Sequence, residues 1–388
     1  MPHPFTGVAI AGVHNTVQAR RLPGHDSRSI ALEAALGALA DAGVPASDVD
    51  GVVGEFAADQ VLALGLGSAV RRPTALGIPA VLDAAALVAT GQCEVVLVAA
   101  GGAGLYTDRS QTAPWTRPTN ELVVGYGLFT AAEFALMARR HMVRHGTTPV
   151  QLATVAATIR NNGSAHPGAV YAGRGPFAPD DILASRMVAD PFHLLDCSMT
   201  SEGGCAMVLT TAERAADGPT RPVHLLGGGS EAFGPAYTIA PSWDLGADRG
   251  EGTPAGYVGR GAARRAFAMA GLGPTDVDVL ELYDPFSFEI IRQLEAFGFC
   301  DDGDGGPLVE SGAIAPGGRH PVTTDGGTMS YSHAGISAQQ LQRVIRGVEQ
   351  LRGGCAGTQV AGAEVALCSN GGAGALFTDV LLLGRERP

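Results

Sequence analysis

The chain has 388 residues with 46% hydrophobic and 16% charged residues, 55 glycines and a net charge of −12. This composition predicts a compact globular protein of two or three domains or one duplicated fold, and it argues against a nucleic-acid partner, which would require a basic surface. All 26 basic residues are arginine, so a Schiff base on lysine, covalently held pyridoxal phosphate and a Walker-type phosphate loop are excluded.

The N-terminal segment lacks a basic region followed by a long apolar stretch, and no run of about 18 apolar residues occurs elsewhere. The six cysteines lie far apart in the sequence and include no Cys-x-x-Cys pair. We therefore expect a cytoplasmic protein with reduced thiols that is neither exported nor membrane-spanning.

The chain contains an internal duplication. Residues 42–52 (AGVPASDVDGV) recur as residues 270–280 (AGLGPTDVDVL), and both copies follow an alanine-rich helical pattern and lead into a short β-branched segment. Residues 94–104 (EVVLVAAGGAG) recur as residues 364–374 (EVALCSNGGAG). Both are apolar runs that end in glycines, which is typical of a strand buried on both faces. Two α/β halves are therefore predicted to pack against each other.

The first half is predicted to span residues 1–215 and the second half residues 216–388. Residues 105–190 form a long insertion in the first half, with helical patterns at 130–146 and 149–164. Sheets of the α/β class bind ligands beyond the carboxyl ends of their strands, where such insertions commonly cover the substrate. We interpret residues 105–190 as a substrate lid.

No metal site and no bound cofactor are expected. His141 and His145 lie one helical turn apart, but several arginines flank them and no carboxylate separates them, so we expect a solvated basic face rather than a metal site. The acidic run Asp301, Asp302 and Asp304 lacks the ligand pattern of a calcium loop and is expected to be a solvated turn.

Four further segments resemble the thiolase superfamily, specifically its sterol-carrier-protein branch. The segment 196–211 (DCSMTSEGGCAMVLTT) resembles the one that closes the first thiolase half, and 281–300 (ELYDPFSFEIIRQLEAFGFC) resembles the one with the catalytic Asn or His. The segment 323–338 (TTDGGTMSYSHAGISA) resembles the Gly-His-Pro segment, and 366–374 (ALCSNGGAG) resembles the terminal Cys-x-Gly-Gly loop. The resemblance covers nearly the whole chain and implies a duplicated thiolase fold of the α/β class, with two α/β halves in five αβαβα layers.

The departures from the thiolase pattern change the implied chemistry. His333 occupies the place of the catalytic histidine and Cys368 that of the second catalytic cysteine, but Thr74 stands where counting from the following helix places the nucleophilic cysteine. Tyr283 replaces the catalytic Asn or His. A subgroup that lacks the nucleophile and carries tyrosines resembling Tyr283 and Tyr331 consists of lipid-transfer-protein-type aldolases of steroid side-chain degradation, which cleave a β-hydroxyacyl-CoA.

The subgroup resemblance implies retro-aldol cleavage of a steroid side-chain CoA thioester to a ketone and a short acyl-CoA, without an acyl-cysteine. This reaction needs a base for the hydroxyl group, a stabiliser of the enolate oxygen and an acid for the α-carbon. Our hypothesis assigns Tyr283 to hydroxyl deprotonation, His333 to the thioester carbonyl and its enolate, and Tyr331 to proton return at carbon. Gly371 and Gly372 could supply N–H groups to an oxyanion or could permit close packing.

Two alternatives remain at this point. The chain could be an acyl-CoA acetyltransferase or thiolase that uses Cys368 with His333, although Cys368 could equally be an inert core residue. It could also be a non-catalytic thiolase-like subunit. The resemblance implies a homodimer and an OB-fold partner that together form a heterotetramer, and coenzyme A would enter only as part of the acyl-CoA substrate.

Overall fold

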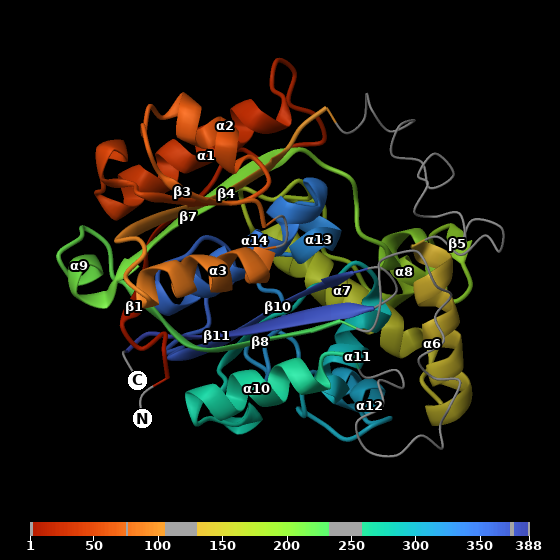
Figure 1. Ribbon diagram of the computed structural model, residues 1–388. Coiled ribbons are helices and arrows are strands. Elements are labelled where there is room, and N and C mark those ends of the chain that lie inside the picture. The colour runs from red at the N-terminus through yellow and green to blue at the C-terminus, as the bar shows by residue number, and fades with distance from the viewer. Residues whose placement is uncertain (1–2, 75–76, 105–129, 233–257, 373–375, 387–388) are drawn as a thin grey trace.

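The computed structural model describes residues 3–74, 77–104, 130–232, 258–372 and 376–386. These residues form five alternating layers of helix, sheet, helix, sheet and helix (Figure 1). The layered arrangement confirms the expected fold class. The strands form one continuous sheet of nine strands with the order β3-β2-β4-β7-β1-β8-β11-β10-β9. We call β3-β2-β4-β7-β1 the first strand group and β8-β11-β10-β9 the second strand group.

The strands of this sheet are β1 (Val8–Asn15), β2 (Gly51–Val53), β3 (Val70–Arg72), β4 (Val95–Gly102), β7 (Gly203–Thr211), β8 (Val223–Ala232), β9 (Val279–Glu281), β10 (Val365–Gly372) and β11 (Phe377–Gly384). A separate small hairpin pairs β5 (Met187–Ala189) with β6 (Phe192–His193). Only two residue pairs, Ala9 with His224 and Ile10 with Val223, join β1 to β8. This short contact is where one strand group passes into the other.

Most of the described helices lie in three layers or in the insertion 105–190. The first outer layer holds α1 (Ser27–Ala42), α2 (Ala57–Ala63) and the turn η1 (Ala46–Asp48), the central layer holds α3 (Gly77–Ala89) and α14 (Gly335–Arg352), and the second outer layer holds α10 (Arg260–Ala270), η5 (Pro274–Asp276), α11 (Ser287–Ala296) and α12 (Gly305–Glu310). The remaining helices are α6 (Ala131–His145), α7 (Pro149–Ala165), α8 (Pro179–Ala184), η4 (Leu194–Asp196), α9 (Ala212–Ala216) and α13 (Gly327–Ser330).

The predicted repeat is present as a structural repeat. The series α1, η1, β2 is matched by α10, η5, β9, and strand β4 is matched by β10. Both outer helices end at a glycine in the left-handed region, Gly43 with φ 66° and Gly271 with φ 68°. Glycine adopts this conformation without the Cβ clash that other residues suffer. Ala34, Ala35 and Ala38 of α1 are fully buried.

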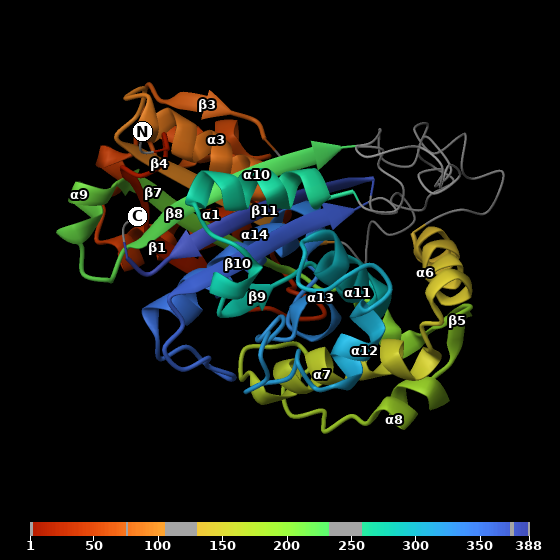
Figure 2. The same ribbon diagram turned by 90° about the horizontal axis from the view of Figure 1, so that it is seen from below.

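The second half of the insertion is packed into the core. Helices α6, α7 and α8 lie beside α11, α12 and α13, beyond the end of the second strand group (Figure 2). Leu152, Val155 and Ile159 of α7 are at most 1% exposed and belong to the large hydrophobic cluster that includes α11. Residues 105–129 of the predicted lid lie outside the described residues.

The expected basic face around His141 is wrong. The His141 ring is buried, and its nitrogens contact the Thr147 hydroxyl at 2.7 Å and the Glu295 carboxylate at 3.0 Å. Glu295 lies 154 residues further along the chain, so the sequence around His141 did not reveal it. The imidazole ties α6 to α11 and is a structural residue. Among the described helices, none combines the length and apolar character needed to cross a membrane.

Candidate active site

Tyr283 lies in the loop between β9 and α11 and is nearly buried. Its backbone N–H donates to Ser369 Oγ of β10 at 3.0 Å, and its carbonyl accepts from Gln293 Nε2 of α11 at 2.7 Å. A Cβ placed on Gly371 would be 3.8 Å from Tyr283 Cδ1 and only 2.9 Å from the Phe377 carbonyl oxygen. The structure therefore brings Tyr283 and Gly371 together, and glycine at 371 allows the strand β11 to approach closely.

Tyr331 follows the last residue of α13 and is 5% exposed. Its ring packs edge-to-face against His166, with 5.0 Å between the ring centroids. Burial raises the pKa of the Tyr331 phenol well above its usual value, the carboxylates of Glu349 and Asp325 raise it further, and Arg343 opposes them. The phenol is therefore protonated at neutral pH, as a proton donor must be.

His333 lies two residues further, just before α14, and is half-buried. Its backbone N–H donates to Ser201 Oγ at 2.7 Å, and Ser201 Oγ lies 3.2 Å from the hydroxyl of Ser332, which donates to Gln18 Oε1 at 2.6 Å. Burial lowers the pKa of His333 to about 4, although contacts with the Met199 backbone and the Gln339 side chain oppose the shift. The imidazole is therefore neutral at physiological pH and carries one N–H donor.

The segments of the two tyrosines are joined directly. The Asp284 carboxylate accepts hydrogen bonds from the backbone N–H groups of Thr328 and Met329 at 2.7 and 3.0 Å. Asp284 follows Tyr283, and Met329 lies two residues before Tyr331. The structure thus places the Tyr283 loop against the turn that carries Tyr331 and leads to His333.

The N-terminus of α3, which the superfamily nucleophile would precede, is satisfied from within the chain. The N–H of Ile78 donates to Asn370 Oδ1 at 2.8 Å, and the N–H of Gly77 donates to Gln340 Oε1 at 3.3 Å. Gln340 Nε2 in turn donates to the carbonyl of Gly371 at 3.0 Å. Side chains at a helix N-terminus replace the missing intrahelical acceptors. Asn370 and Gln340 were not predicted from the sequence, although Asn370 lies inside the segment 366–374 that resembles the terminal thiolase loop.

Cys368 is not brought together with His333. Its side chain is fully buried against α14, where a Cβ on Gly347 would be 2.6 Å from the Cys368 sulfur. Gly347 is twelve residues beyond Gly335 on α14, which corresponds to about 18 Å along the helix from the end that follows His333. Burial raises the pKa of the Cys368 thiol well above its usual value. Its surroundings are those of a core residue.

No other thiol in the chain is activated, and all six cysteines lie in the part that the structure describes. Burial raises the pKa of each of them, to about 11 for Cys93 and Cys355 and to about 12 for Cys197 and Cys300. The thiolate is the nucleophilic form, so such a thiol is poorly reactive. Thr74 donates its hydroxyl hydrogen to Asp83 at 2.5 Å; residues 75–76 lie outside the described residues.

Arg160 of α7 binds two distant segments of the chain and was not predicted from the sequence. Its guanidinium donates to the carbonyls of Leu195, Met329 and Cys197 at 2.7, 3.0 and 2.9 Å. The side chain is 1% exposed. A planar guanidinium can donate in several directions at once, whereas a lysine ammonium cannot reproduce that arrangement.

We expect Arg160→Met to lower the free energy of unfolding by about 3 kcal/mol or more, because three buried carbonyls would lose their donor. Urea unfolding followed by circular dichroism measures the effect. Arg139→Met is the matched control, since Arg139 is half exposed and pairs with Asp190 at 3.5 Å; it should change stability by less than about 1 kcal/mol. Equal stabilities of the two variants would contradict the role assigned to Arg160.

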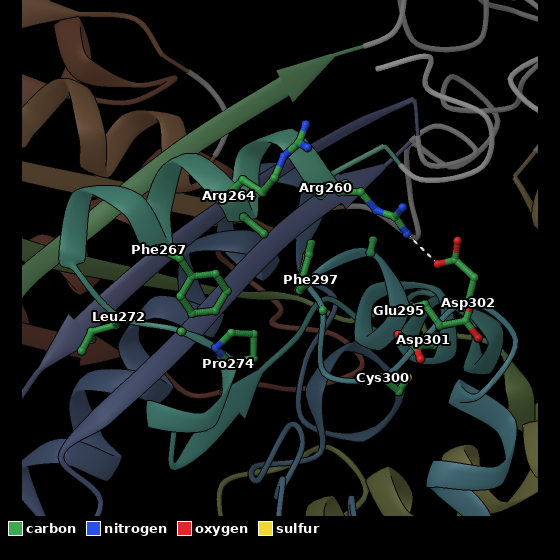
Figure 3. Close-up of a pocket in the computed structure, with 14 residues that line it drawn as sticks. Arg260, Arg264, Phe267, Leu272, Pro274, Glu295, Phe297, Cys300, Asp301 and Asp302 are labelled. Atoms are coloured by element: carbon green, nitrogen blue, oxygen red, sulfur yellow. Dashed lines mark hydrogen bonds and ion pairs between the residues drawn. The ribbon is translucent and has the colours of Figure 1, made fainter. Parts of the chain in front are cut away.

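A surface pocket of about 760 Å³ lies elsewhere, between α10 and the end of α11 (Figure 3). Phe267, Phe297 and Pro274 form its apolar part, and Arg260 pairs with Asp302 at 2.6 Å beside it. None of the predicted site residues lines this pocket. Within the described residues, no group of three or more His, Cys, Asp or Glu side chains is arranged to hold a metal ion.

The thiolase C-terminal domain-like family model matches residues 255–385. Three curated relatives are each 33% identical to this chain. They are a 17-hydroxy-3-oxo-4-pregnene-20-carboxyl-CoA lyase of Mycobacterium tuberculosis (94% of this chain, 96% of the relative), an acetyl-CoA acetyltransferase of Methanothermobacter thermautotrophicus (95% and 97%) and a steroid side-chain-cleaving aldolase of Thermomonospora curvata (87% and 90%).

Solved structures show the same fold. The structure described as "Ltp2-ChsH2(DUF35) aldolase" superposes with a TM-score of 0.82 at 29% identity and covers 98% of both chains. Human mitochondrial 3-ketoacyl-CoA thiolase superposes with a TM-score of 0.71 at 13% identity, over 97% of this chain and 98% of the other. The latter likeness concerns the fold alone.

Proposed function

Because this chain belongs to the thiolase superfamily and is similar over nearly its whole length to steroid side-chain-cleaving aldolases, we propose that it is a carbon–carbon lyase that cleaves a β-hydroxyacyl-CoA by a retro-aldol reaction. The observation that carries this proposal is the combination of two buried phenols on adjoining segments with six cysteines whose thiol pKa values are all raised. Thiolytic acyl transfer needs a covalent carrier, whereas retro-aldol cleavage does not.

The proposed reaction begins at the β-hydroxyl group. Tyr283 accepts the hydroxyl proton as the oxygen becomes a carbonyl, and the electron pair of the breaking Cα–Cβ bond passes to the thioester as an enolate. We propose that Tyr283 acts as the phenolate and becomes a neutral phenol when it takes up the hydroxyl proton, because a neutral phenol has no basic site for that proton. The first product is a ketone.

His333 is proposed to stabilise the enolate oxygen through its N–H. A neutral imidazole suits this role, since it can donate without being a competing proton source. Its depressed pKa of about 4 keeps it in that form. Gly371 and Gly372 remain candidates for further backbone donors, and Gly371 packs against Tyr283.

Tyr331 is proposed to return a proton to the α-carbon and so release the short acyl-CoA. Its phenol has a raised pKa, which keeps the proton available until the enolate carbon accepts it. One proton is taken by Tyr283 and one is given by Tyr331, so the pair is restored by exchange with solvent. The cycle requires no net acid, base or oxidant.

A steroid thioester is the proposed substrate class, because one relative is named as a lyase of a pregnene-20-carboxyl-CoA and another as a steroid side-chain-cleaving aldolase. Cleavage of a 17-hydroxy-pregnene-20-carboxyl-CoA between C17 and C20 would release a 17-ketone and propanoyl-CoA. The test incubates the purified chain with this thioester and follows both products by liquid chromatography and mass spectrometry. Absence of both products, with the partner described below also present, would contradict the proposed function and favour a non-catalytic subunit.

The acetyltransferase alternative makes a different prediction about Cys368. An acetyl-CoA acetyltransferase is among the relatives, but Cys368 is buried against α14 and its thiol pKa is raised. We expect Cys368→Ala to leave the cleavage rate within about two-fold of the original, and incubation with acyl-CoA to produce no acyl adduct by mass spectrometry. Cys300→Ala is the matched control. A stoichiometric adduct that disappears in Cys368→Ala would overturn the aldolase proposal.

For the assembly, we propose a homodimer that binds an OB-fold protein and forms a heterotetramer in the cytoplasm. The support is the solved structure whose description names ChsH2 (DUF35) together with Ltp2. Light scattering of the chain, alone and co-expressed with a DUF35 protein, measures the masses of both assemblies.

A further inference from the structure

We propose that Asp284 is a positioning residue that sets the separation of the two phenols, because its carboxylate holds the Tyr283 loop against the turn that ends at Tyr331. This inference rests on the proposed function and adds a residue that acts through the position of Tyr283 relative to Tyr331. Asp284 is fully buried and is the covalent neighbour of Tyr283. Any displacement of its carboxylate therefore changes the position of Tyr283 relative to α13.

The contact is made at the N-terminus of α13, a helical turn of only four residues. Asp284 uses both carboxylate oxygens, one for the N–H of Thr328 at 2.7 Å and one for the N–H of Met329 at 3.0 Å. The Thr328 hydroxyl also donates to the Asp284 carbonyl at 2.7 Å. The first N–H groups of so short a turn have no acceptor within the helix, so the Asp284 carboxylate accepts their hydrogen bonds instead.

Glycine makes this approach possible. Gly326 and Gly327 have φ angles of 101° and 55°, which other residues rarely adopt. A Cβ on Gly327 would lie 2.3 Å from both Asp284 carboxylate oxygens. The Gly-Gly pair in the segment 323–338 therefore leaves room for the Asp284 carboxylate.

A second aspartate completes the cap. Asp325 accepts the N–H of Gly327 at 2.8 Å and two hydrogen bonds from Arg343 of α14, each 2.7 Å long. Arg343 is fully buried. The first three N–H groups of the turn are thus divided between Asp325 and Asp284. Asp325 ties the turn to α14, whereas Asp284 ties it to the loop of Tyr283.

The far end of the turn is held independently of Asp284. The Met329 carbonyl accepts from Arg160, and the carbonyls of Ser330 and Tyr331 accept from the N–H groups of Tyr171 and Val170, each at 3.1 Å. Tyr331 and His333 therefore keep their relation to each other through these contacts and through their own short segment. Loss of the Asp284 carboxylate should displace Tyr283 from this pair rather than disperse all three.

Asp284→Asn tests the inference, because the amide keeps the shape of the side chain but points an N–H₂ group at one of the two N–H donors. Two reactions are measured on each variant. One is cleavage of the steroid thioester, which requires Tyr283. The other is exchange of the α-protons of propanoyl-CoA in D₂O, which runs the last step in reverse and requires only Tyr331 and His333.

We expect Asp284→Asn to lower kcat for cleavage by about 10²-fold, since a displacement of about 1 Å can have that effect, with KM and the exchange rate within about three-fold. Thr328→Val, which removes one hydroxyl donor and keeps the shape, should lower kcat for cleavage by a smaller factor and should also leave the exchange rate within about three-fold. Asp301→Asn is the exposed control and should alter neither.

Equal losses of cleavage and exchange in Asp284→Asn and in Thr328→Val would mean that Asp284 supports the fold generally, and would overturn the inference. Unchanged cleavage in both variants would overturn it as well. Failure of the proposed function has a different signature, because the unmodified chain would then neither cleave the thioester nor exchange the α-protons.

Discussion

Tyr283→Phe is expected to lower kcat for cleavage of the β-hydroxyacyl-CoA by roughly 10³-fold, a typical contribution of a positioned general base. The phenylalanine ring keeps the contact with Gly371, and the backbone hydrogen bonds to Ser369 and Gln293 do not involve the hydroxyl group. The fold should therefore be preserved. Steady-state kinetics measures the loss of kcat, and thermal unfolding of the same preparation measures whether the fold is preserved.

The α-proton exchange of propanoyl-CoA separates the role of Tyr283 from that of Tyr331. Exchange does not involve the β-hydroxyl group, so Tyr283→Phe should leave its rate within about three-fold. Tyr171→Phe is the comparison variant; it removes a phenol hydroxyl that is hydrogen-bonded to Arg20 at 3.1 Å and to Arg160. Near-original cleavage by Tyr283→Phe would remove Tyr283 from the mechanism.

His333→Ala should lower both cleavage and exchange, by about 10²- to 10³-fold, because both reactions pass through the same enolate. His333→Asn retains an N–H donor and should recover part of the loss. His25→Ala, at a half-exposed surface position that pairs with Glu33 at 4.0 Å, serves as the control. A variant that loses cleavage but keeps exchange would contradict an enolate-stabilising role for His333.

The pH dependence of exchange is a second readout of the same histidine. The pKa of His333 is depressed to about 4, so the imidazole stays neutral between pH 8 and about pH 5.5 and should cause no loss of exchange there. The unfolded chain has an ordinary histidine pKa of about 6.5. The contribution of His333 to stability is therefore full above about pH 6.5 and is lost as the pH falls towards 4. A decline of exchange with an apparent pKa near 6.5 that His333→Asn abolishes would contradict a neutral donor.

Local patterns in the sequence were sufficient to predict the repeat. The alanine spacing before residues 42 and 270 and the glycines that follow them predicted α1 and α10, because helix periodicity and a left-handed C-cap depend on neighbouring residues only. The same holds for β4 and β10, whose apolar runs end in glycine.

Contacts between distant residues were beyond the reach of these patterns. The buried His141 ring has a hydrogen-bond partner in the Glu295 carboxylate, which lies 154 residues away in the chain. The buried Arg160 has its partners in three carbonyls from two distant segments. Cys368 stands in the motif position of a catalytic residue, yet strand alternation turns its side chain towards Gly347. The direction of a side chain depends on which neighbour the strand packs against.

The sequence by itself determined the α/β repeat and the absence of lysine chemistry, and it supplied the candidate site residues Tyr283, Tyr331 and His333. Only the tertiary structure decided which of these residues share a neighbourhood, how their protons are held and which thiols are buried. The physical reason is that periodicity and turn chemistry act over a few residues. Burial, pKa shifts and the Asp284 contact arise when segments more than forty residues apart exclude water together.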